Sequence, residues 1–331
     1  MEKDRDRDRR GDGAGPVAYP PRTIGASAFL PSGSVLYAFM LLLLFFLPLS
    51  NTTLAQKNKP SSLRGLSLTV HIGMLRADNS HADFYNGAPQ NANTLERILY
   101  SETYGNAIWN NLTEQDLIGS AVANYHQITV AEYGDMYYKP AIQLGMGFRY
   151  DLDPSLWAWQ LAFDYAKLHA QGLVLLNSGK NITTLTNQNR YVNCPATGVE
   201  ERIYINLGII RKFHLQNGFD LEAALGANVN NTKVESSDIR IAGVTYSILD
   251  IWGGQAPSSY VGSYEYINQG GIGYGAWASL RFGFTLPAGT AMSLDYTLHY
   301  NKVNLIGYRD FAFHHAIGLN VAINNFSFFD S

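Results

Sequence analysis

Charged residues are scarce in this sequence. Only 15% of the 331 residues are Asp, Glu, Lys or Arg, whereas soluble domains carry about 25%. The deficit indicates a protein that contacts surroundings less polar than water. The formal net charge is only −3, which gives no electrostatic reason to expect nucleic acid as a partner.

Cysteine is nearly absent as well. Cys194 is the single cysteine, so no intrachain disulfide can form. It lies in the polar stretch TNQNRYVNCPATG, which favours an inert loop thiol over a reactive one. No cysteine follows the amino-terminal apolar run, and this excludes a lipoprotein anchor for that leader.

The common catalytic motifs are missing too. The sequence contains no GxSxG, no HExxH, no P-loop and no glycine-rich dinucleotide turn. We therefore predict a protein that is not an enzyme and that needs no cofactor or metal. Catalysis by Asp, His and Ser residues at strand tips is the alternative.

The amino terminus has the features of an exported chain. Residues 1–34 combine Asp-Arg alternation with Pro and Gly, which is typical of disorder. Residues 35–55 contain an apolar run of signal-peptide length, too short for a membrane-spanning helix. Thr53 and Ala55 occupy the positions that signal peptidase reads, so Gln56 is the expected mature end. An uncleaved signal anchor and an internal translation start are the alternatives.

After a polar linker at 56–65, residues 66–329 contain eight segments in which every second residue is apolar. A period of two predicts β-strands. The expected strands are 66–75, 141–151, 157–168, 202–213, 219–229, 273–284, 292–301 and 311–323.

Two hairpins can be aligned from their turns. The strands on either side of Ala288 place Phe284 opposite Met292 and Arg281 opposite Asp295. Opposite charges therefore meet on the polar face of this hairpin.

The strands on either side of Gln216 place Phe213 opposite Phe219 and Lys212 opposite Asp220. This second hairpin also brings opposite charges together on its polar face.

The alternation fits a half-buried soluble sheet or a barrel wall with lipid outside and a polar lumen inside. Loop lengths favour the second interpretation. Long connections at 76–139, 170–200 and 231–271 alternate with short turns, as in barrels whose extracellular loops are long and periplasmic turns short. We predict an all-β, antiparallel, up-and-down transmembrane β-barrel of about eight strands. Ten to twelve strands, or a soluble lipocalin-like barrel, are the alternatives.

With this leader, eight alternating segments and an aromatic carboxyl terminus, residues 66–329 resemble the small outer-membrane barrels of the OmpA/OmpX kind. These include the PorT-like "outer membrane protein beta-barrel domain" proteins. The resemblance implies the outer membrane of a Gram-negative bacterium, with lipid and the barrel-insertion machinery as partners. In such families a terminal aromatic strand is the insertion signal, and Phe326, Phe328 and Phe329 match that role although two residues follow them.

Charged residues on the inward faces are expected to form a lumenal cluster. Its members are Arg281, Asp295, Glu222, Arg149 and Asp164. We predict an Arg281–Asp295 ion pair with Glu222 as a third member, because a buried charge needs a partner. Eight strands leave a narrow lumen that side chains fill, so a plug is favoured over a proton or ion gate.

Histidines and aromatic residues supply the remaining candidates. His71, His299 and His314 point inward and are expected to fill the lumen, since their spacing matches no metal-ligand motif. The expected aromatic girdle beside the short turns consists of Trp157, Trp159, Tyr150, Phe213, Phe219 and Phe284. A ligand surface on the loops is expected from Tyr246, Trp252, Tyr260, Tyr264 and Tyr266.

Together these features predict a closed barrel that displays surface loops for structural or interaction roles. A surface ligand or an envelope protein is the expected partner. A porin-like channel or transporter is the first alternative, and an accessory component of a secretion or assembly machine, as the PorT-like resemblance implies, is the second.

Overall fold

The computed structural model describes residues 65–153, 156–180, 190–215, 219–249, 269–285 and 290–323. All of them belong to one compact unit within residues 59–331. The leader, the signal region and the proposed insertion signal at Phe326, Phe328 and Phe329 lie outside the described residues.

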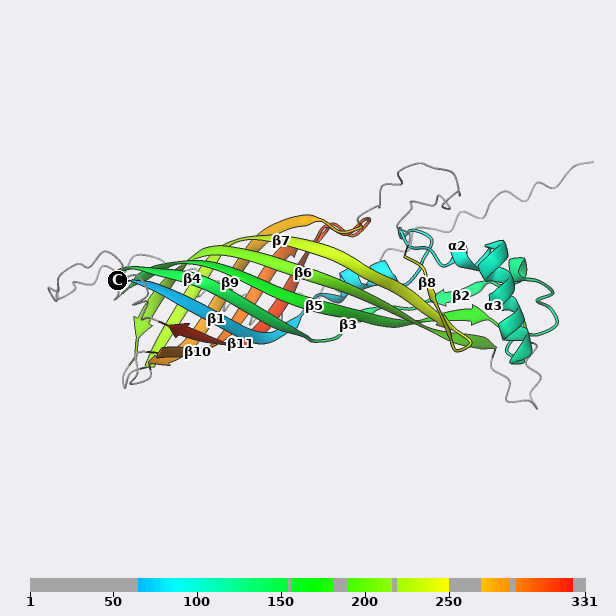
Figure 1. The fold of residues 1–331 in the computed structure, drawn as a ribbon, viewed down its shortest axis with the longest axis horizontal. Helices are drawn as coiled ribbons and strands as arrows, with labels where there is room; N and C mark the ends of the chain where they lie inside the picture. Colours follow the sequence, from blue (N-terminus) through cyan, green and yellow to red (C-terminus); the bar gives the residue numbers. More distant parts are fainter. Residues whose placement is uncertain are drawn as a thin grey trace, which may run out of the picture. The chain divides into compact units, whose positions relative to one another are not determined.

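Among the described residues, eight strands form a closed ring (Figure 1). Each strand pairs antiparallel with the next, and the last pairs with the first. The predicted eight-strand up-and-down barrel is thereby confirmed. The ring consists of β1 (Leu66–Arg76), β4 (Ala141–Asp153), β5 (Trp157–Asn177), β6 (Tyr191–His214), β7 (Phe219–Ile241), β9 (Ile272–Thr285), β10 (Thr290–Lys302) and β11 (Phe311–Ile323).

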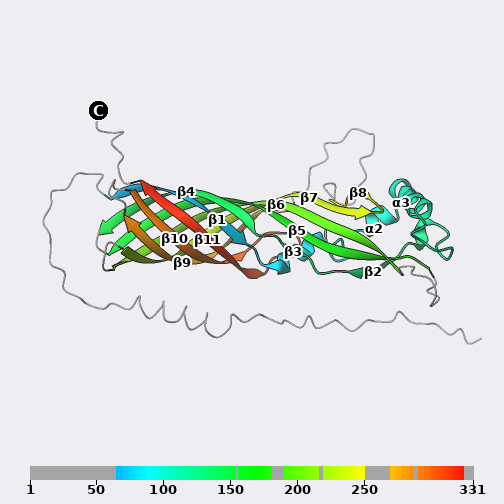
Figure 2. The same cartoon turned by 90° about the horizontal axis from the view of Figure 1, so that it is seen from below.

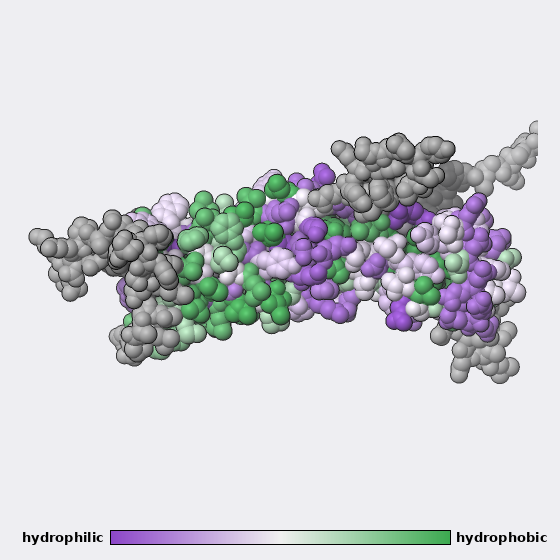
Figure 3. Space-filling view, viewed as in Figure 1, coloured by the Kyte–Doolittle hydropathy of each residue, from purple (hydrophilic) through white to green (hydrophobic). Residues whose placement is uncertain are grey.

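Alternating side chains give the ring an apolar outer face and a polar inner face. On β4, Ile142, Leu144 and Met146 are more than half exposed, whereas Gln143 between them is buried. The same pattern recurs around the ring, and Figure 3 shows the exposed apolar residues as a continuous band over the barrel wall. We call this band the apolar belt. This distribution of apolar residues is the reverse of that in a soluble barrel, where they lie inside.

The apolar belt ends at one level on three adjacent strands. Outward residues on β5 change from Tyr165 to Lys167, and those on β6 change from Ile203 to Glu201. Lys167 Nζ lies 2.5 Å from Glu235 on β7, and the Tyr165 hydroxyl donates to Glu201 over 2.7 Å. Beyond this ionic row hydrophilic residues predominate on the outer surface (Figure 3).

β5, β6 and β7 continue well past the ends of the other ring strands, as both ribbon views show (Figures 1 and 2). We call residues 167–177, 191–201 and 231–241 the strand extension. Segments 170–200 and 231–271 were expected to be loops. That prediction is wrong for much of each segment, which forms strand instead. The reason is that apolar residues move to the inner face, where Val192, Cys194 and Ala196 are buried, while the outward positions become polar.

The inner face of the strand extension is covered by residues 77–139 together with β8 (Val244–Ser247), which we call the cap. β2 (Val130–Tyr133) and β3 (Tyr137–Tyr138) pair with β5, and β8 pairs with β7. None of the described helices is both long and apolar enough to cross a membrane. The other elements of the cap are η1 (Asn79–Tyr85), α2 (Glu96–Leu99), α3 (Glu102–Glu114) and η2 (Tyr125–Gln127).

Apolar packing joins the cap to the strand extension. Ile108 and Leu112 of α3 recur at a helical spacing of four and are fully buried. Tyr85 lies flat over Gly198 of β6, where a Cβ atom would come within 2.2 Å of the Tyr85 ring. This core, which resembles that of a soluble protein, was not predicted. The sequence analysis assigned elements only where every second residue is apolar, and that pattern identifies the strands of the belt but not the helices of the cap.

The register of one predicted hairpin is confirmed and that of the other is wrong. β9 and β10 pair Phe284 with Met292 and Arg281 with Asp295, as expected.

In the β6–β7 hairpin, Phe213 pairs with Leu221 rather than Phe219, and Lys212 pairs with Glu222 rather than Asp220. The partner is displaced by two positions, which equals the side-chain period, so every residue keeps its predicted face.

Candidate functional site

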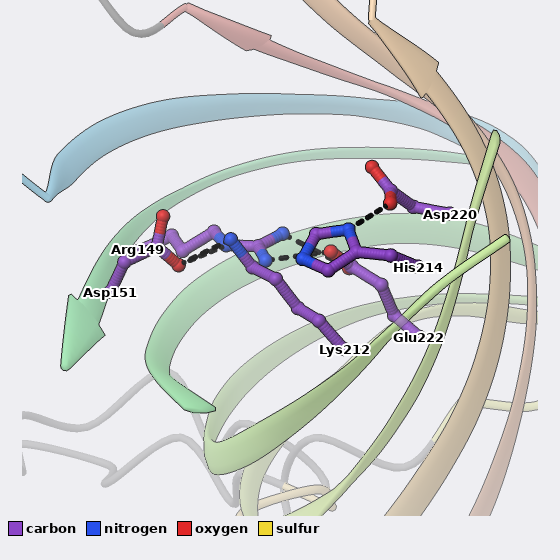
Figure 4. Close-up of polar contacts among 6 residues, drawn as sticks. All are labelled: Arg149, Asp151, Lys212, His214, Asp220 and Glu222. Atoms are coloured by element: carbon purple, nitrogen blue, oxygen red, sulfur yellow. Dashed lines mark hydrogen bonds and ion pairs between the residues drawn. The ribbon is translucent and has the colours of Figure 1, made fainter. Parts of the chain in front are cut away.

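The bore of the barrel is bridged near the short turns by a bidentate ion pair (Figure 4). Arg149 Nη1 and Nη2 donate to the two carboxylate oxygens of Glu222 over 3.0 and 2.6 Å. The two residues come from β4 and β7, which are separated in the ring by β5 and β6. The contact therefore spans the bore, and paired planar groups of this kind are among the stronger polar contacts.

Two further charges complete this group. Arg149 Nε donates to Asp151 over 3.1 Å, and Lys212 Nζ lies 2.9 Å from the same Asp151 oxygen (Figure 4). Two cations and two carboxylates balance, which is what permits all four side chains to lie largely out of solvent, between 11% and 21% exposed. We call Arg149, Asp151, Lys212 and Glu222 the bore bridge. His214 and Asp220 form a separate pair, 2.6 Å apart and more exposed.

The predicted Arg281–Asp295 ion pair does not form. The two residues are cross-strand neighbours and both are buried, yet no contact within 4.0 Å joins their charged atoms in the described structure. Glu222, the expected third member, forms its ion pair with Arg149 across the bore. Asp295 instead faces His71, whose Nε2 lies 3.8 Å from its Oδ1.

His71 lies between two carboxylates. Its Nδ1 is 3.2 Å from Asp164 Oδ1, while its Nε2 faces Asp295. Asp164 also accepts a hydrogen bond from Asn206 over 2.7 Å, and Asn228 donates to Asn206 over 2.6 Å. Acid, imidazole and amide groups from β1, β5, β6, β7 and β10 thus interlock in the middle of the bore.

A cavity of about 30 Å³ lies beside this cluster, lined in part by His71, Asp164, Arg281 and His299. A space of that size admits about two water molecules. The buried ring of Trp277 also occupies part of the bore, and its Nε1 donates to the Ala227 carbonyl, which fixes the position of the ring. The bore is therefore filled by side chains along this stretch.

A second buried ion pair lies where the bore meets the cap. Arg202 Nε donates to Glu200 over 2.6 Å, and both side chains are 0% exposed. Glu200 also accepts from the hydroxyls of Tyr85 over 2.7 Å and Tyr138 over 3.2 Å. Burial, reinforced by the Glu200 charge, raises the pKa of both tyrosines, so they remain donors.

Sequence reasoning missed Glu200 and Arg202 as a site because Glu200 fell in the expected loop 170–200, whereas Arg202 was the first residue of the expected strand 202–213. Their spacing of two on one strand face, followed by Tyr204 on the same face, was the available signal. Asp151 and Lys212 were on predicted inward faces, but their partners lie on strands that are not neighbours, and strand pairing alone cannot show this.

The three predicted lumenal histidines all lie inside the barrel, and two of them are neighbours. His299 and His314 are direct cross-strand partners, whereas His71 pairs with Asn320 further along β11. The His299 ring stacks on Tyr204, and His314 Nδ1 accepts from the Asp78 backbone N–H. In the described part of the chain, no cluster of His, Cys, Asp or Glu could hold a metal ion.

His81 on η1 packs beside His314, with ring centroids 5.8 Å apart. Burial and the nearby Arg202 charge lower the pKa of His81, and the Asp310 carbonyl, Glu200 and Asp78 oppose this less strongly. Its Nδ1 is buried and has no hydrogen-bond partner in the described structure. The folded protein therefore holds His81 neutral.

We expect acid to loosen the cap. The unfolded chain protonates His81 near pH 6.5, while the folded chain does so only at lower pH, so stability is lost as the pH falls below about 6.5. Hydrogen exchange at η1, measured between about pH 7.5 and pH 5.5, should show falling protection in the natural protein. His81→Gln should show a smaller fall, and an unchanged pH dependence would contradict the assignment.

The residues expected to form the girdle lie at the outer surface beside the short turns. Tyr150 pairs with Trp159 and Phe219 pairs with Phe284 in the strand registers, and all four are between 39% and 47% exposed. The two others are Trp157 and Phe213, which flank the Arg211 guanidinium at 5.1 and 5.5 Å.

Of the five residues expected to form a ligand surface on the loops, only Tyr246 lies among the described residues. Tyr246 lies on β8 and packs partly against the core of the cap. Trp252, Tyr260, Tyr264 and Tyr266 lie outside the described residues. Cys194 lies on β6 rather than in the expected loop, and burial raises the pKa of its thiol to about 12, which disfavours the reactive thiolate.

The described residues thus define a closed β-barrel with a polar bore filled by side chains and a structured cap. No family model matches the sequence, and no curated protein matches it. Similar solved structures include Neisserial surface protein A, at 8% identity and TM-score 0.37, covering 79% of this chain and 97% of that one. The outer membrane protein OprG from Pseudomonas aeruginosa is 10% identical, with TM-score 0.35 and coverages of 78% and 97%.

Ail, the attachment invasion locus protein of Yersinia pestis, is 9% identical, with TM-score 0.29 and coverages of 79% and 100%. At such low identities and scores, the function has to be inferred from this chain's own residues.

Proposed function

We propose that this chain is an integral barrel of the outer membrane of a Gram-negative bacterium, exported with a cleaved signal peptide. Its bore is closed, and it presents the strand extension and the cap outside the cell as a rigid platform for binding. The apolar belt is the observation that supports this most strongly. A closed ring leaves no strand edge unpaired in lipid, and its exposed apolar face requires a lipid environment.

The orientation follows from the connections. The short turns lie at one end of the barrel and the strand extension and cap lie at the other, and outer-membrane barrels place their short turns on the periplasmic side. The ionic row of Lys167, Glu201, Lys233 and Glu235 then marks the outer edge of the bilayer. The cap then lies on the extracellular side, beginning near the level of the ionic row, where Tyr85 contacts Glu200, and continuing outward along the strand extension.

The belt predicts how the protein responds to a new charge. Leu207→Arg on β6 places a cation on the outward face in the middle of the belt, which we expect to cost about 2–4 kcal/mol of folding free energy in lipid. Thr197→Arg, on the same face of the same strand but in the strand extension, should cost less than about 0.5 kcal/mol. Guanidinium titrations in lipid vesicles measure both. Equal effects would contradict the membrane assignment.

A channel is the competing function, and the filled bore argues against it. Planar bilayer recordings of the purified protein should show no steady conductance steps, because the bore bridge and the His71 cluster leave only small cavities. Steady steps would overturn the closed-barrel proposal. Partners that co-purify after cross-linking would instead favour the accessory role in an assembly machine.

A further inference from the structure

A groove of about 580 Å³ lies at the end of the strand extension farthest from the apolar belt. Four segments form its walls: the end of α3 with Gln115 and Asp116, the residues after β5 with Lys180, the start of β6 with Tyr191 and Asn193, and the end of β7 with Arg240. Its volume falls within the range of small-molecule sites. None of the residues used to close the bore contributes to it.

The walls of the groove are tied together by hydrogen bonds. Gln115 Nε2 and Asn111 Nδ2 both donate to the Ala242 carbonyl, over 2.9 and 3.2 Å, which fixes α3 against the β7–β8 turn. Lys180 Nζ lies 3.2 Å from the Asp116 carboxylate. The groove is therefore formed before any ligand arrives, which lowers the ordering cost of binding.

The lining is suited to sugars rather than to apolar ligands. Tyr191 is 39% exposed, and the face of its ring that Arg190 does not cover can contact the C–H groups of a sugar. The amides of Gln115 and Asn193 can donate and accept, as sugar hydroxyls do. The Asp116 side chain is 85% exposed and can accept from hydroxyls while Lys180 holds it.

Arg240 adds a selective positive charge. Its Nε donates to the Gly243 carbonyl over 3.2 Å, which orients the guanidinium. Within the described residues the two terminal nitrogens have no partner, so a planar anion can bind them side by side. Arg190 lies 5.6 Å from the Tyr191 ring centroid and places a second cation at this end of the strand extension.

We propose that this groove binds an acidic oligosaccharide, with Arg240 on a sugar carboxylate and Tyr191 against a sugar ring. The inference deepens the proposed function and rests on it, because the groove reaches a surface glycan only if the cap lies outside the cell. The same chemistry could come from an acidic polysaccharide of the producing cell or from a foreign surface.

Calorimetric titration of the full chain in detergent micelles tests this, with tetragalacturonate as the probe and neutral galactotetraose as its counterpart. We expect binding of the acidic sugar only. Arg240→Gln should weaken it about tenfold or more, as loss of a charged hydrogen-bond pair does, and Tyr191→Ala should also weaken it. Lys233→Gln is the matched control, since it removes an exposed cation from the same strand outside the groove.

Absence of binding, equal binding of both sugars, or equal losses in Arg240→Gln and Lys233→Gln would each overturn the proposal. A parallel titration with acidic polysaccharide purified from the producing cells identifies the source, since tighter binding than to tetragalacturonate would indicate the cell's own glycan. Failure here, with Leu207→Arg and Thr197→Arg differing as expected, would remove the groove ligand and leave the membrane assignment intact.

Discussion

Glu200→Ala is expected to lower the free energy of unfolding by about 3–5 kcal/mol, the cost of leaving a buried charge without its partner. Arg202 is 0% exposed and its Nη1 already has no hydrogen-bond partner in the described structure. Without Glu200, the hydroxyls of Tyr85 and Tyr138 lose their acceptor as well. The loss should fall on the junction between bore and cap.

Denaturant titrations in micelles measure the change, and hydrogen exchange locates it. Glu201→Ala is the matched control, because Glu201 is the next residue on β6 and faces outward, 3.9 Å from Lys233. Removing that surface pair should cost about 0–1 kcal/mol. If both alanine variants lost the same stability, the pair would not hold the junction. The double variant Glu200→Leu/Arg202→Met should recover most of the loss, since no charge remains to be buried.

How far the sequence predicts this fold depends on which face of a strand is apolar. All eight belt strands were found, because residues such as Leu144, Ile205 and Leu294 face outward at every second position. The strand extension was missed because the apolar set moves to the inner face between Tyr165 and Leu168 on β5. A search for one continuous amphipathic pattern ends at that inversion, although the strand itself continues to Asn177.

The site was predicted in its composition but not in its pairings. Arg281 was paired with Asp295 because the ladder places them opposite each other. Closure of the ring instead brings Arg149 within reach of Glu222, and a bidentate contact across the bore competes better than a single cross-strand contact. Such contacts depend on the curvature of the whole ring, which no local spacing contains.

The bore bridge gives the second large effect. Glu222→Ala should lower the free energy of unfolding by about 3–5 kcal/mol, because Arg149 and Lys212 would then share the single carboxylate of Asp151 at a site largely shielded from solvent. The double variant Arg149→Met/Glu222→Met should recover most of that loss, since Asp151 and Lys212 remain paired. Denaturant titrations of the natural protein, Arg149→Met, Glu222→Met and the double variant give the coupling energy directly.

The same variants test whether one contact closes the bore. We expect Glu222→Ala to remain non-conducting in planar bilayers, because the bore is also filled by Trp277 and by the group around His71, Asp164 and Asp295. Closure would then be distributed along the bore, whereas folding free energy would be concentrated at the bridge. Conductance steps in Glu222→Ala alone, at a stability close to that of the natural protein, would assign the bridge the opposite role, that of a gate rather than a structural tie.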